Sequence, residues 1–301
     1  MKYSQWRNWM IEHPWSFKCG KGKLAKKYNV PEEWIIKVRE EVKNKNLESV
    51  KILILDIETS PMKAYVWKRW KENISLDQTI SEWFMISWAA KWLNDSNTLG
   101  DCITPEEAKK EDDSRICSSL WDLLDQADIV IAHNAKHFDI PKINSRFISN
   151  NLPPTSSFKI IDTLNVAQKQ FGFSSNKLDA LAINFGIQTK LNTDFTLWRD
   201  CLNGDQEALD YMLKYNKMDV EILEKVYLKL RPWIKDHPNI ATISNSSRLM
   251  CPICGSEHII KYENKYHHTV LSKYQQYYCA DCGATLRDRH KVNKSTQLIS
   301  V

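Results

Sequence analysis

The sequence predicts an α/β protein in which a mixed β-sheet is flanked by helices. Short apolar runs alternate with amphipathic segments from residue 50 to 235, and strands that alternate with helices form layered α/β domains. Smaller units are expected at the ends, because residues 1–48 have a helical pattern and residues 248–290 contain two Cys-x-x-Cys motifs. The α/β domain itself is expected to occupy residues 49–240.

Composition restricts what the chain can be. The 301 residues are 43% hydrophobic and 11% aromatic, which is enough for a packed core and unlike a disordered chain. No apolar run approaches the roughly 18 residues of a membrane span, and the aromatic, polar N-terminus is unlike a signal peptide. We expect a cytoplasmic protein with reduced thiols and no membrane partner. A bacterial or phage-infected cell is our hypothesis for its setting.

Charge is unevenly distributed along the chain. Residues 1–50 carry 11 Lys and Arg against 6 Asp and Glu, and residues 246–301 carry 8 against 4, whereas residues 51–245 carry 23 against 27. This pattern suits a protein that contacts a polyanion with its ends and cations with its centre. Lysine-rich termini also occur for solubility alone, so the charge does not decide between the two interpretations.

The N-terminal segment resembles a helix-turn-helix between residues 23 and 42. Asn29 tolerates a left-handed turn, and Pro31 opens the second helix. A helix-turn-helix binds DNA through its second helix. Because Glu32 and Glu33 would lie unfavourably against phosphates, a small protein-docking unit is an equally good interpretation.

Periodicity assigns the elements of the α/β segment. β-branched and aliphatic residues fill 50–55, as in a strand that is buried on both faces. The other expected strands are 84–92, 99–103, 127–132 and one that starts at 160. The expected helices are 118–126, 141–150, 178–185 and 206–230.

Two carboxylates follow the first strand. Asp56 and Glu58 are two residues apart, and side chains at that spacing on a strand project to the same face. Two close anions repel each other, and a bridging cation removes this cost. The pair alone is a weak indication, because acidic residues are common at the ends of surface strands.

A third acid, Asp139, follows the expected strand 127–132 and lies two residues before Pro141. An Asp ahead of Pro is typical of a helix start, so Asp139 considered alone is expected to cap a helix. A side chain at this strand-to-helix turn also faces the same sheet edge as Asp56. The position of Asp139 is therefore compatible with capping the helix and also with lying near Asp56 at the sheet edge.

The helix expected at 206–230 carries an acid on its core-facing side. Asp219 shares a stripe with Tyr215 and apolar residues at three- and four-residue spacing, and such a stripe faces the core. A buried carboxylate is costly unless a cation or hydrogen bonds compensate it. Tyr215 lies one turn earlier and can approach whatever Asp219 binds. A buried arginine or a backbone amide is the alternative partner.

Together, these motifs resemble the DEDD superfamily of 3′–5′ exonucleases, which has the ribonuclease H-like fold. The matching strings are Leu55-Asp56-Ile57-Glu58-Thr59, Asn134-x3-Phe138-Asp139 and Tyr215-x3-Asp219. The second spacing is most similar to the exonucleases of B-family DNA polymerases and their stand-alone relatives. Tyr215 indicates the tyrosine subclass, because the histidine subclass has His where this chain has Lys214. The resemblance covers about residues 50–232.

This resemblance implies a metal-dependent 3′–5′ exonuclease that acts on nucleic acid with a free 3′ end, DNA more than RNA. It implies that Asp56, Glu58 and Asp219 bind two Mg²⁺ or Mn²⁺ ions, with Asp139 assisting through water. Two ions about 3.5–4 Å apart would hold the scissile phosphate, one activating the attacking water and one stabilising the leaving 3′ oxygen. A replication or repair protein is an expected partner.

Further positions are implied by the same resemblance. Tyr215 and Glu58 would orient the attacking water, which makes Tyr215 the fifth catalytic position beside the four acids. Thr59 would contact the terminal nucleotide through its backbone. The full set of expected substrate contacts is Thr59, Asn134 and Phe138.

The C-terminal cysteines have the spacing of a zinc ribbon. Cys251-x2-Cys254 and Cys279-x2-Cys282 are separated by 24 residues, and a glycine follows each pair. Four thiolates form a closed, tetrahedral structural site. We expect one Zn²⁺ in this unit.

Aromatic and basic residues are interleaved between residues 65 and 92. Such a mixture can stack unpaired bases, although most large aromatic side chains are expected in the core. We expect one or two to be exposed to the substrate. The residues concerned are Trp67, Lys68, Arg69, Trp70, Lys71, Trp83, Phe84, Trp88 and Trp92.

Three other functions compete with a DNA exonuclease. The chain is alternatively a non-catalytic DNA-binding or regulatory protein that keeps the fold as a scaffold, a structure-selective endonuclease, or an RNA exonuclease. The presence of all four acids disfavours the first, because a retired site is expected to lose at least one. A 3′-blocked or circular substrate separates an endonuclease from an exonuclease.

Overall fold

The computed structural model describes residues 5–6, 9–10, 13, 19, 21–45, 50–187, 193–244, 246 and 248–293. Contacts divide the chain into two units. One consists of Met1–Val50 with Ile240–Arg248, which includes the short helix α11 (Ile240–Ile243), and the other consists of Lys51–Asn239 with Leu249–Val301. Within the described ranges, no helix is long and apolar enough to cross a membrane.

The first unit is helical where it is described. Helix α2 (Lys21–Tyr28) and helix α3 (Glu32–Lys45) are joined at Asn29, whose φ of 51° lies in the left-handed region. This is the turn that the sequence predicts. Apolar side chains of both helices pack with Trp6 and Met10 in a small buried core. Binding of nucleic acid by this unit stays a prediction.

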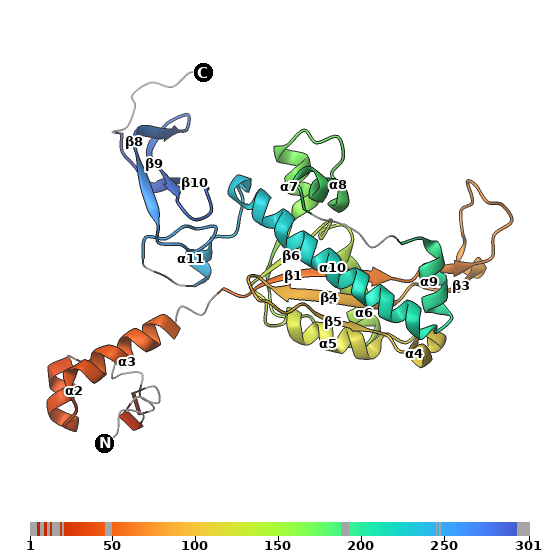
Figure 1. Ribbon diagram of the computed structural model, residues 1–301, viewed down its shortest axis with the longest axis horizontal. Helices are drawn as coiled ribbons and strands as arrows, with labels where there is room; N and C mark the ends of the chain where they lie inside the picture. Colours follow the sequence, from red (N-terminus) through yellow and green to blue (C-terminus); the bar gives the residue numbers. More distant parts are fainter. Residues whose placement is uncertain are drawn as a thin grey trace. The chain divides into compact units, whose positions relative to one another are not determined.

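A five-stranded mixed sheet is the centre of the second unit (Figure 1). Its strands are β1 (Ile52–Thr59), β4 (Met85–Trp92), β5 (Leu99–Cys102), β6 (Ile129–Ala132) and β7 (Lys159–Asp162), in the order β5-β4-β1-β6-β7. β1 is antiparallel to β4 and parallel to β6. The mixed sheet predicted from the apolar runs is therefore confirmed, and β1 extends beyond its predicted end to include both Asp56 and Glu58.

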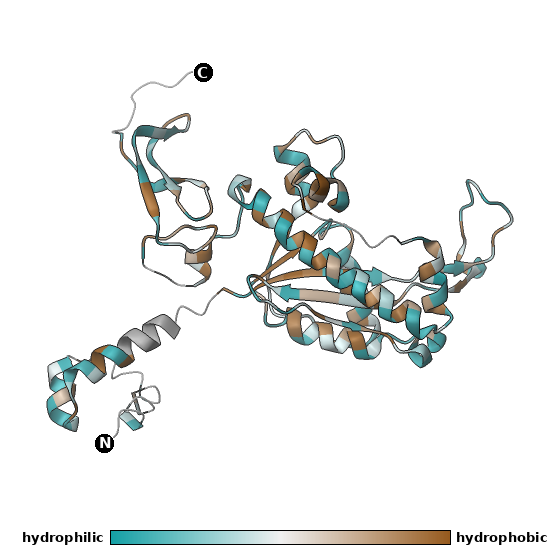
Figure 2. Ribbon diagram, in the orientation of Figure 1, coloured by the Kyte–Doolittle hydropathy of each residue, from teal (hydrophilic) through white to brown (hydrophobic). Residues whose placement is uncertain are grey.

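Hydrophobic burial explains the position of these strands. In Figure 2 the inner strands β1 and β6 are among the brown, hydrophobic segments, and every residue of β6 is buried. One set of alternate side chains of β1, which includes Leu53 and Leu55, packs in the main core. Because side chains alternate along a strand, Asp56 and Glu58 project to the other face.

Helices cover both faces of the sheet. The long helix α10 (Gln206–Leu230) coincides with the predicted range, whereas three short helices of this unit were not predicted from the sequence. These three are α4 (Pro105–Lys110), α7 (Thr163–Gln170) and α9 (Phe195–Leu202). The predicted helices α5 (Ser114–Leu124) and α6 (Asp139–Ser149) begin four and two residues earlier than expected, and α8 (Leu178–Asn184) is close to its prediction.

A buried ion pair fixes α10 against the sheet. Nζ of Lys91 on β4 lies 2.6 Å from Oε2 of Glu224 on α10, and the side chains are only 13% and 10% exposed. Lys91 is paired in register with Ile54 on β1. Asp56 lies two strand residues beyond Ile54, about 7 Å, and Asp219 lies five helical residues before Glu224, about 7.5 Å. The ion pair thus places Asp219 over the end of β1 that carries Asp56.

Three smaller features complete this unit. Between β1 and β4 the chain forms a hairpin of β2 (Lys63–Ala64) and β3 (Thr79–Ser81), with the 3-10 helix η2 (Leu76–Gln78) before β3. A second 3-10 helix, η3 (Arg231–Trp233), follows α10. The C-terminal part is a three-stranded antiparallel sheet of β8 (Ile259–His268), β9 (Lys273–Cys279) and β10 (Thr285–Lys291).

Candidate active site

Three carboxylates from two elements meet at one end of the sheet. Asp56 and Glu58 come from the last residues of β1, and Asp219 comes from the middle of α10. One oxygen from each of the three lies within 4.8 Å of the others. The structure therefore brings together the three acids that the sequence predicts as metal ligands, and we call them the acidic triad.

Asp139 lies beside the acidic triad but does not cap its helix. It is the first residue of α6, and the N-cap position is occupied by Phe138 without a side-chain hydrogen bond. The capping role expected for Asp139 considered alone is therefore wrong, because Asp139 is already inside the helix. Its side chain is 1% exposed, and neither carboxylate oxygen accepts a hydrogen bond from the residues that the structure describes.

Burial is the largest cause of a raised pKa at each of these acids, and repulsion between them adds to it at Asp56 and Glu58. Burial, followed by repulsion from Asp139, Glu58 and Asp219, raises the pKa of Asp56 well above its ordinary value. Burial, followed by repulsion from Asp219 and Asp139, raises the pKa of Glu58 to about 8. Burial raises the pKa of Asp139 to about 7 and that of Asp219 to about 6. Without a compensating cation, these acids therefore hold protons at higher pH than ordinary carboxylates do.

Tyr215 and Asn216 connect α10 to the acidic triad. The Tyr215 hydroxyl hydrogen-bonds the Asp219 carboxylate, which partly offsets the rise in the pKa of Asp219. A buried arginine or a backbone amide was the alternative to a cation as the predicted partner of Asp219. In the structure the Tyr215 hydroxyl is its hydrogen-bond partner. Asn216 is fully buried and donates from Nδ2 to Oδ2 of Asp56 at 2.5 Å. Asn216 was not predicted as a site residue, although a polar residue on the buried side of α10 next to Tyr215 is a usable signal.

Asp162 shapes the loop that leads to Asp139, and it was also missed. It ends β7, caps α7 by accepting from the N–H groups of Leu164 and Asn165, and is 3% exposed. It also accepts from the backbone N–H groups of Asn134 and Lys136 at 3.1 Å. An acid directly after an apolar strand is the same signal that marks Asp56, so Asp162 was detectable from the sequence.

The three expected substrate contacts have different environments. Thr59 ends β1 and is half-buried, with a break in the strand register between Glu58 and Thr59. Asn134 is half-buried with a left-handed φ of 74°, and its carbonyl accepts from the N–H of Phe138. Phe138 is 37% exposed although it directly precedes the buried Asp139. A ring that is accessible next to the acids is in a suitable place to contact a nucleotide base.

The donor set fits divalent cations. Carboxylate oxygens are the ligands that Mg²⁺ and Mn²⁺ prefer. The acidic triad offers three such groups at ligand spacing. Asp139 contributes two buried oxygens that lack hydrogen-bond partners among the described residues. Such a cluster is expensive without cations, so these residues can hold metal ions.

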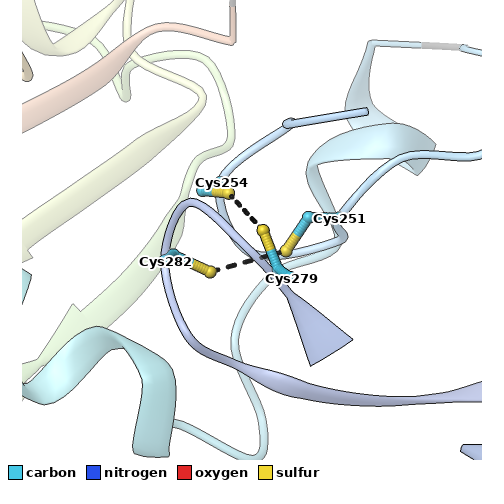
Figure 3. A group of neighbouring side chains, drawn as sticks. All are labelled: Cys251, Cys254, Cys279 and Cys282. Carbon is cyan, nitrogen blue, oxygen red and sulfur yellow. Dashed lines mark hydrogen bonds between the residues drawn. The ribbon is translucent and has the colours of Figure 1, made fainter. Parts of the chain in front are cut away.

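A second candidate metal centre is formed by the four C-terminal cysteines (Figure 3). Sγ of Cys251 lies 3.7 Å from that of Cys282, and Sγ of Cys254 lies 3.6 Å from that of Cys279. A tetrahedral Zn²⁺ with Zn–S bonds of about 2.3 Å requires S···S separations of roughly 3.8 Å. The four side chains can therefore form a zinc site.

Glycines shape the two loops that supply these cysteines. Gly255 and Gly283 have φ angles of 79° and 78°, which favour glycine. Their N–H groups donate to the carbonyls of Cys251 and Cys279, each at 2.9 Å. The turn residues that the sequence identified after each Cys pair are thus required by the backbone conformation.

Comparison with known proteins identifies similarity over the α/β part. A family profile described as the RNase_H superfamily matches residues 53–231. Among solved structures, the family B DNA polymerase from the hyperthermophilic archaeon Pyrobaculum calidifontis is similar with a TM-score of 0.47 and 15% sequence identity. The matched region covers 74% of this chain and 32% of the polymerase chain. The search of curated proteins found no match.

Proposed function

Because this chain belongs to the RNase H superfamily, we propose that it is a metal-dependent 3′–5′ exonuclease that hydrolyses the phosphodiester bonds of DNA. Membership of the superfamily gives the nuclease fold. The 3′–5′ direction, DNA as the polymer and the two-metal mechanism are what we propose. The choice of DNA is based on the similarity of the three sequence motifs to B-family polymerase exonucleases. A replication or repair protein is the proposed type of partner.

One observation carries the proposal. Oxygens of Asp56, Glu58 and Asp219 lie within 4.8 Å of one another although two of the acids are more than 160 positions from the third. The Tyr215 hydroxyl reaches this cluster from the same helix as Asp219. Three converging carboxylates with an adjacent tyrosine are the arrangement that the resemblance to tyrosine-type exonucleases requires.

Each residue has a proposed role in hydrolysis. The acidic triad would hold two Mg²⁺ or Mn²⁺ ions, with Asp139 assisting through water. When bound, such ions activate the attacking water and stabilise the leaving 3′ oxygen. Glu58 and the hydroxyl of Tyr215 orient the water for attack on the phosphorus. Asn216 holds the Asp56 carboxylate in its position as a ligand.

The substrate side of the site is formed by Phe138, Asn134 and Thr59. The exposed Phe138 ring would stack on the base of the terminal nucleotide, while Thr59 contacts that nucleotide through its backbone. The strained backbone of Asn134 holds the loop that presents Phe138. The zinc site would be structural, because four cysteine ligands leave no open position for a substrate.

A comparison of four substrates tests the proposed reaction. A 5′-labelled single DNA strand with a free 3′ hydroxyl should shorten stepwise in Mg²⁺ and remain intact in EDTA. A strand with a blocked 3′ end and a circular single strand should resist digestion, and an RNA strand of the same sequence should be shortened more slowly. Cutting of the circle would indicate an endonuclease, faster digestion of RNA would indicate an RNA exonuclease, and inert substrates would indicate a scaffold.

A further inference from the structure

The hairpin between β1 and β4 presents unusually exposed aromatic side chains. We call residues 60–83 the aromatic arm. Trp67 and Trp70 are 90% and 84% exposed, and Tyr65 is 73% exposed. Tryptophan side chains normally bury most of their large surface. Large rings that the fold of the protein leaves exposed to solvent indicate a surface that binds another molecule.

Basic residues separate the two tryptophans. Lys68 and Arg69 stand between Trp67 and Trp70, Lys71 follows, and all three are exposed. Residues 65–72 carry these three positive charges against one negative charge, that of Glu72. This local excess stands out because the surrounding segment 51–245 is net negative. The tip of the arm therefore attracts a polyanion that the rest of the domain repels.

Hydrogen bonds order the stem of the arm on both strands. At its base, Ser60 N–H donates to the carbonyl of Phe84, and Phe84 N–H donates to Oγ of Ser60, both at 2.8 Å. Farther out, Tyr65 N–H donates to the carbonyl of Gln78 at 2.9 Å, and Nε2 of Gln78 donates to the carbonyl of Tyr65 at 3.1 Å. The exposed tip is thus held out by an ordered stem.

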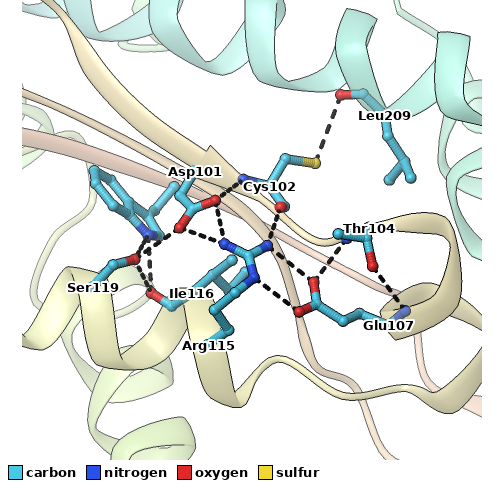
Figure 4. A network of polar contacts seen from close by, with 9 residues as sticks. Asp101, Cys102, Thr104, Glu107, Arg115, Ile116, Ser119 and Leu209 are labelled. Atoms are coloured by element: carbon cyan, nitrogen blue, oxygen red, sulfur yellow. Dashed lines mark hydrogen bonds and ion pairs between the residues drawn. The ribbon is translucent and has the colours of Figure 1, made fainter.

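Helix α4 supports this stem from the side. Oε1 of Glu111, at the end of α4, lies 2.6 Å from Nζ of Lys63 and accepts from Oγ of Ser81 at 3.2 Å, so it joins β2 to β3. α4 is itself anchored by the network in Figure 4, where Arg115 on α5 contacts Glu107 of α4 and Asp101 of β5. The stem of the aromatic arm is therefore attached to the folded α/β domain through α4.

A strip of rings and cations connects the base of the arm with the candidate active site. Nζ of Lys142 on α6 lies 3.6 Å from the centre of the Trp83 ring and 5.3 Å from that of Phe138. Trp83 ends the arm, and Phe138 directly precedes Asp139. In Figure 1 the loop before β3 extends away from the sheet beyond the arrowhead of β1, which is the end that carries Asp56 and Glu58.

We propose that the aromatic arm binds the unpaired part of a nucleic-acid strand, by stacking bases on Trp67 and Trp70, and guides that strand towards the acidic triad. This inference rests on the proposed function for the direction of the strand. A base needs a free face to stack on a tryptophan, and only unpaired bases offer it. A protein partner fits less well, because the centres of protein interfaces are depleted in lysine, whereas the tip alternates lysine and arginine with tryptophan.

Binding of a fluorescent oligothymidylate by the full chain in EDTA tests the arm. The double variant Trp67→Ala/Trp70→Ala should raise Kd roughly tenfold or more for each ring removed, in keeping with base–aromatic stacking. Trp67→Phe/Trp70→Phe should restore most of the affinity, because it restores both rings. The triple variant Lys68→Gln/Arg69→Gln/Lys71→Gln should reduce the slope of log K against log salt by about 2, because each phosphate contact contributes about 0.7.

Leu76→Ala is the matched control, because Leu76 is 91% exposed on the same hairpin and has no ring. It should leave the Kd for oligothymidylate unchanged. An unchanged Kd after removal of both tryptophans would overturn the proposal. If the double variant instead abolished self-association measured by light scattering and kept its strand affinity, the arm would be a contact between copies of the chain.

A one-nucleotide substrate separates this proposal from the proposed function. The wild-type protein should release nitrophenol from the 5′-p-nitrophenyl ester of thymidine monophosphate in Mg²⁺, since this compound is too short to reach the arm. If neither this ester nor a DNA strand is hydrolysed while strand binding depends on the tryptophans, the exonuclease proposal fails and the arm stands. If the ester is hydrolysed and the tryptophans do not affect strand affinity, the arm fails and the nuclease stands.

Discussion

Asn216 on α10 donates a hydrogen bond from Nδ2 to Oδ2 of Asp56 on β1, with an N···O distance of 2.5 Å. Asn216 is fully buried, and this bond lowers the pKa of Asp56 against the larger upward effect of burial. The bond therefore favours the charged form of Asp56, which is the form that binds a cation. It also ties the two elements that supply the acidic triad.

Replacement of Asn216 should weaken metal-dependent activity. Asn216→Leu keeps a similar volume but removes the donor, so Asp56 loses its orientation and part of its charge. Loss of a residue that orients a ligand typically reduces metal affinity or activity about 10- to 100-fold. We expect the Mg²⁺ concentration for half-maximal activity to rise by a factor in that range. A fall in kcat with no change in Mg²⁺ dependence would contradict this positioning role.

Tyr215→Phe should affect the chemical step more than metal binding. The variant removes the hydroxyl that hydrogen-bonds Asp219 and, in our proposal, orients the attacking water. We expect kcat to fall by roughly 100-fold, the lower range for a positioned proton-transfer group. The Mg²⁺ dependence should change little. Single-turnover kinetics measure this step directly, and a wild-type rate constant would remove Tyr215 from the mechanism.

Stability of the metal-free protein should decrease as pH rises from about 4 to about 8. The folded-state pKa values of Glu58, Asp139 and Asp219 are raised, to about 8, 7 and 6. In this window the unfolded chain has released protons that the folded chain still binds, so each unit of pH favours unfolding. Thermal unfolding in EDTA across this range measures the effect.

Two further results should accompany that pH series. Mg²⁺ should raise the melting temperature most at pH 8, because protons no longer compete for the carboxylates. Asp56→Asn removes one of the repelling charges, so in EDTA at pH 8 it should melt several degrees above the wild type. A metal-free melting temperature that is constant or increases from pH 5 to pH 8 would show that folding does not raise the pKa values of these acids as described.

The four-cysteine site should hold one zinc ion per chain. Its closed geometry predicts that zinc is retained at EDTA concentrations that remove Mg²⁺ from the acidic triad. Cys282→Ser should lose the zinc, whereas Cys102→Ser should keep it, since Cys102 lies outside the cluster. Elemental analysis of freshly purified, reduced protein measures the content. Absence of zinc from the wild type would refute the site.

The strands were predictable because their burial leaves a strong trace in the sequence. β1 and β6 are inner strands, and their apolar runs mark them directly. α10 was predictable because it is long and its buried residues recur at helical spacing. The helices α4 and α7 were missed because they are short and mostly polar or charged, whereas α8, of similar length, is mostly apolar. The side chain of Thr104 caps α4, and that of Asp162 caps α7. A cap of this kind is recognised in a sequence only when the first residue of the helix is known.

The candidate site was only partly predictable for a different reason. Spacing on one strand or helix identified Asp56, Glu58, Tyr215 and Asp219, because residues on one element have a fixed relation. The role of Asn216 depends on its contact with Asp56, which joins α10 to β1. The position of α10 is in turn fixed by the ion pair between Lys91 on β4 and Glu224 on α10. Long-range contacts of this kind leave no local pattern. The exposure of Trp67 and Trp70 likewise depends on how far the hairpin projects.

In the proposed function, the acidic triad holds the metal ions with which the protein removes nucleotides from the 3′ end of DNA. The most direct test of this role follows a 5′-labelled single strand in Mg²⁺ with the wild type, Asp219→Asn and Glu221→Gln. Glu221 is an exposed acid on α10, two residues from Asp219. We expect a ladder that shortens from the 3′ end with the wild type and with Glu221→Gln. With Asp219→Asn we expect a loss of about 100- to 1,000-fold, the scale of removing one source of electrostatic stabilisation. Wild-type digestion by folded Asp219→Asn would show that Asp219 has no part in the reaction.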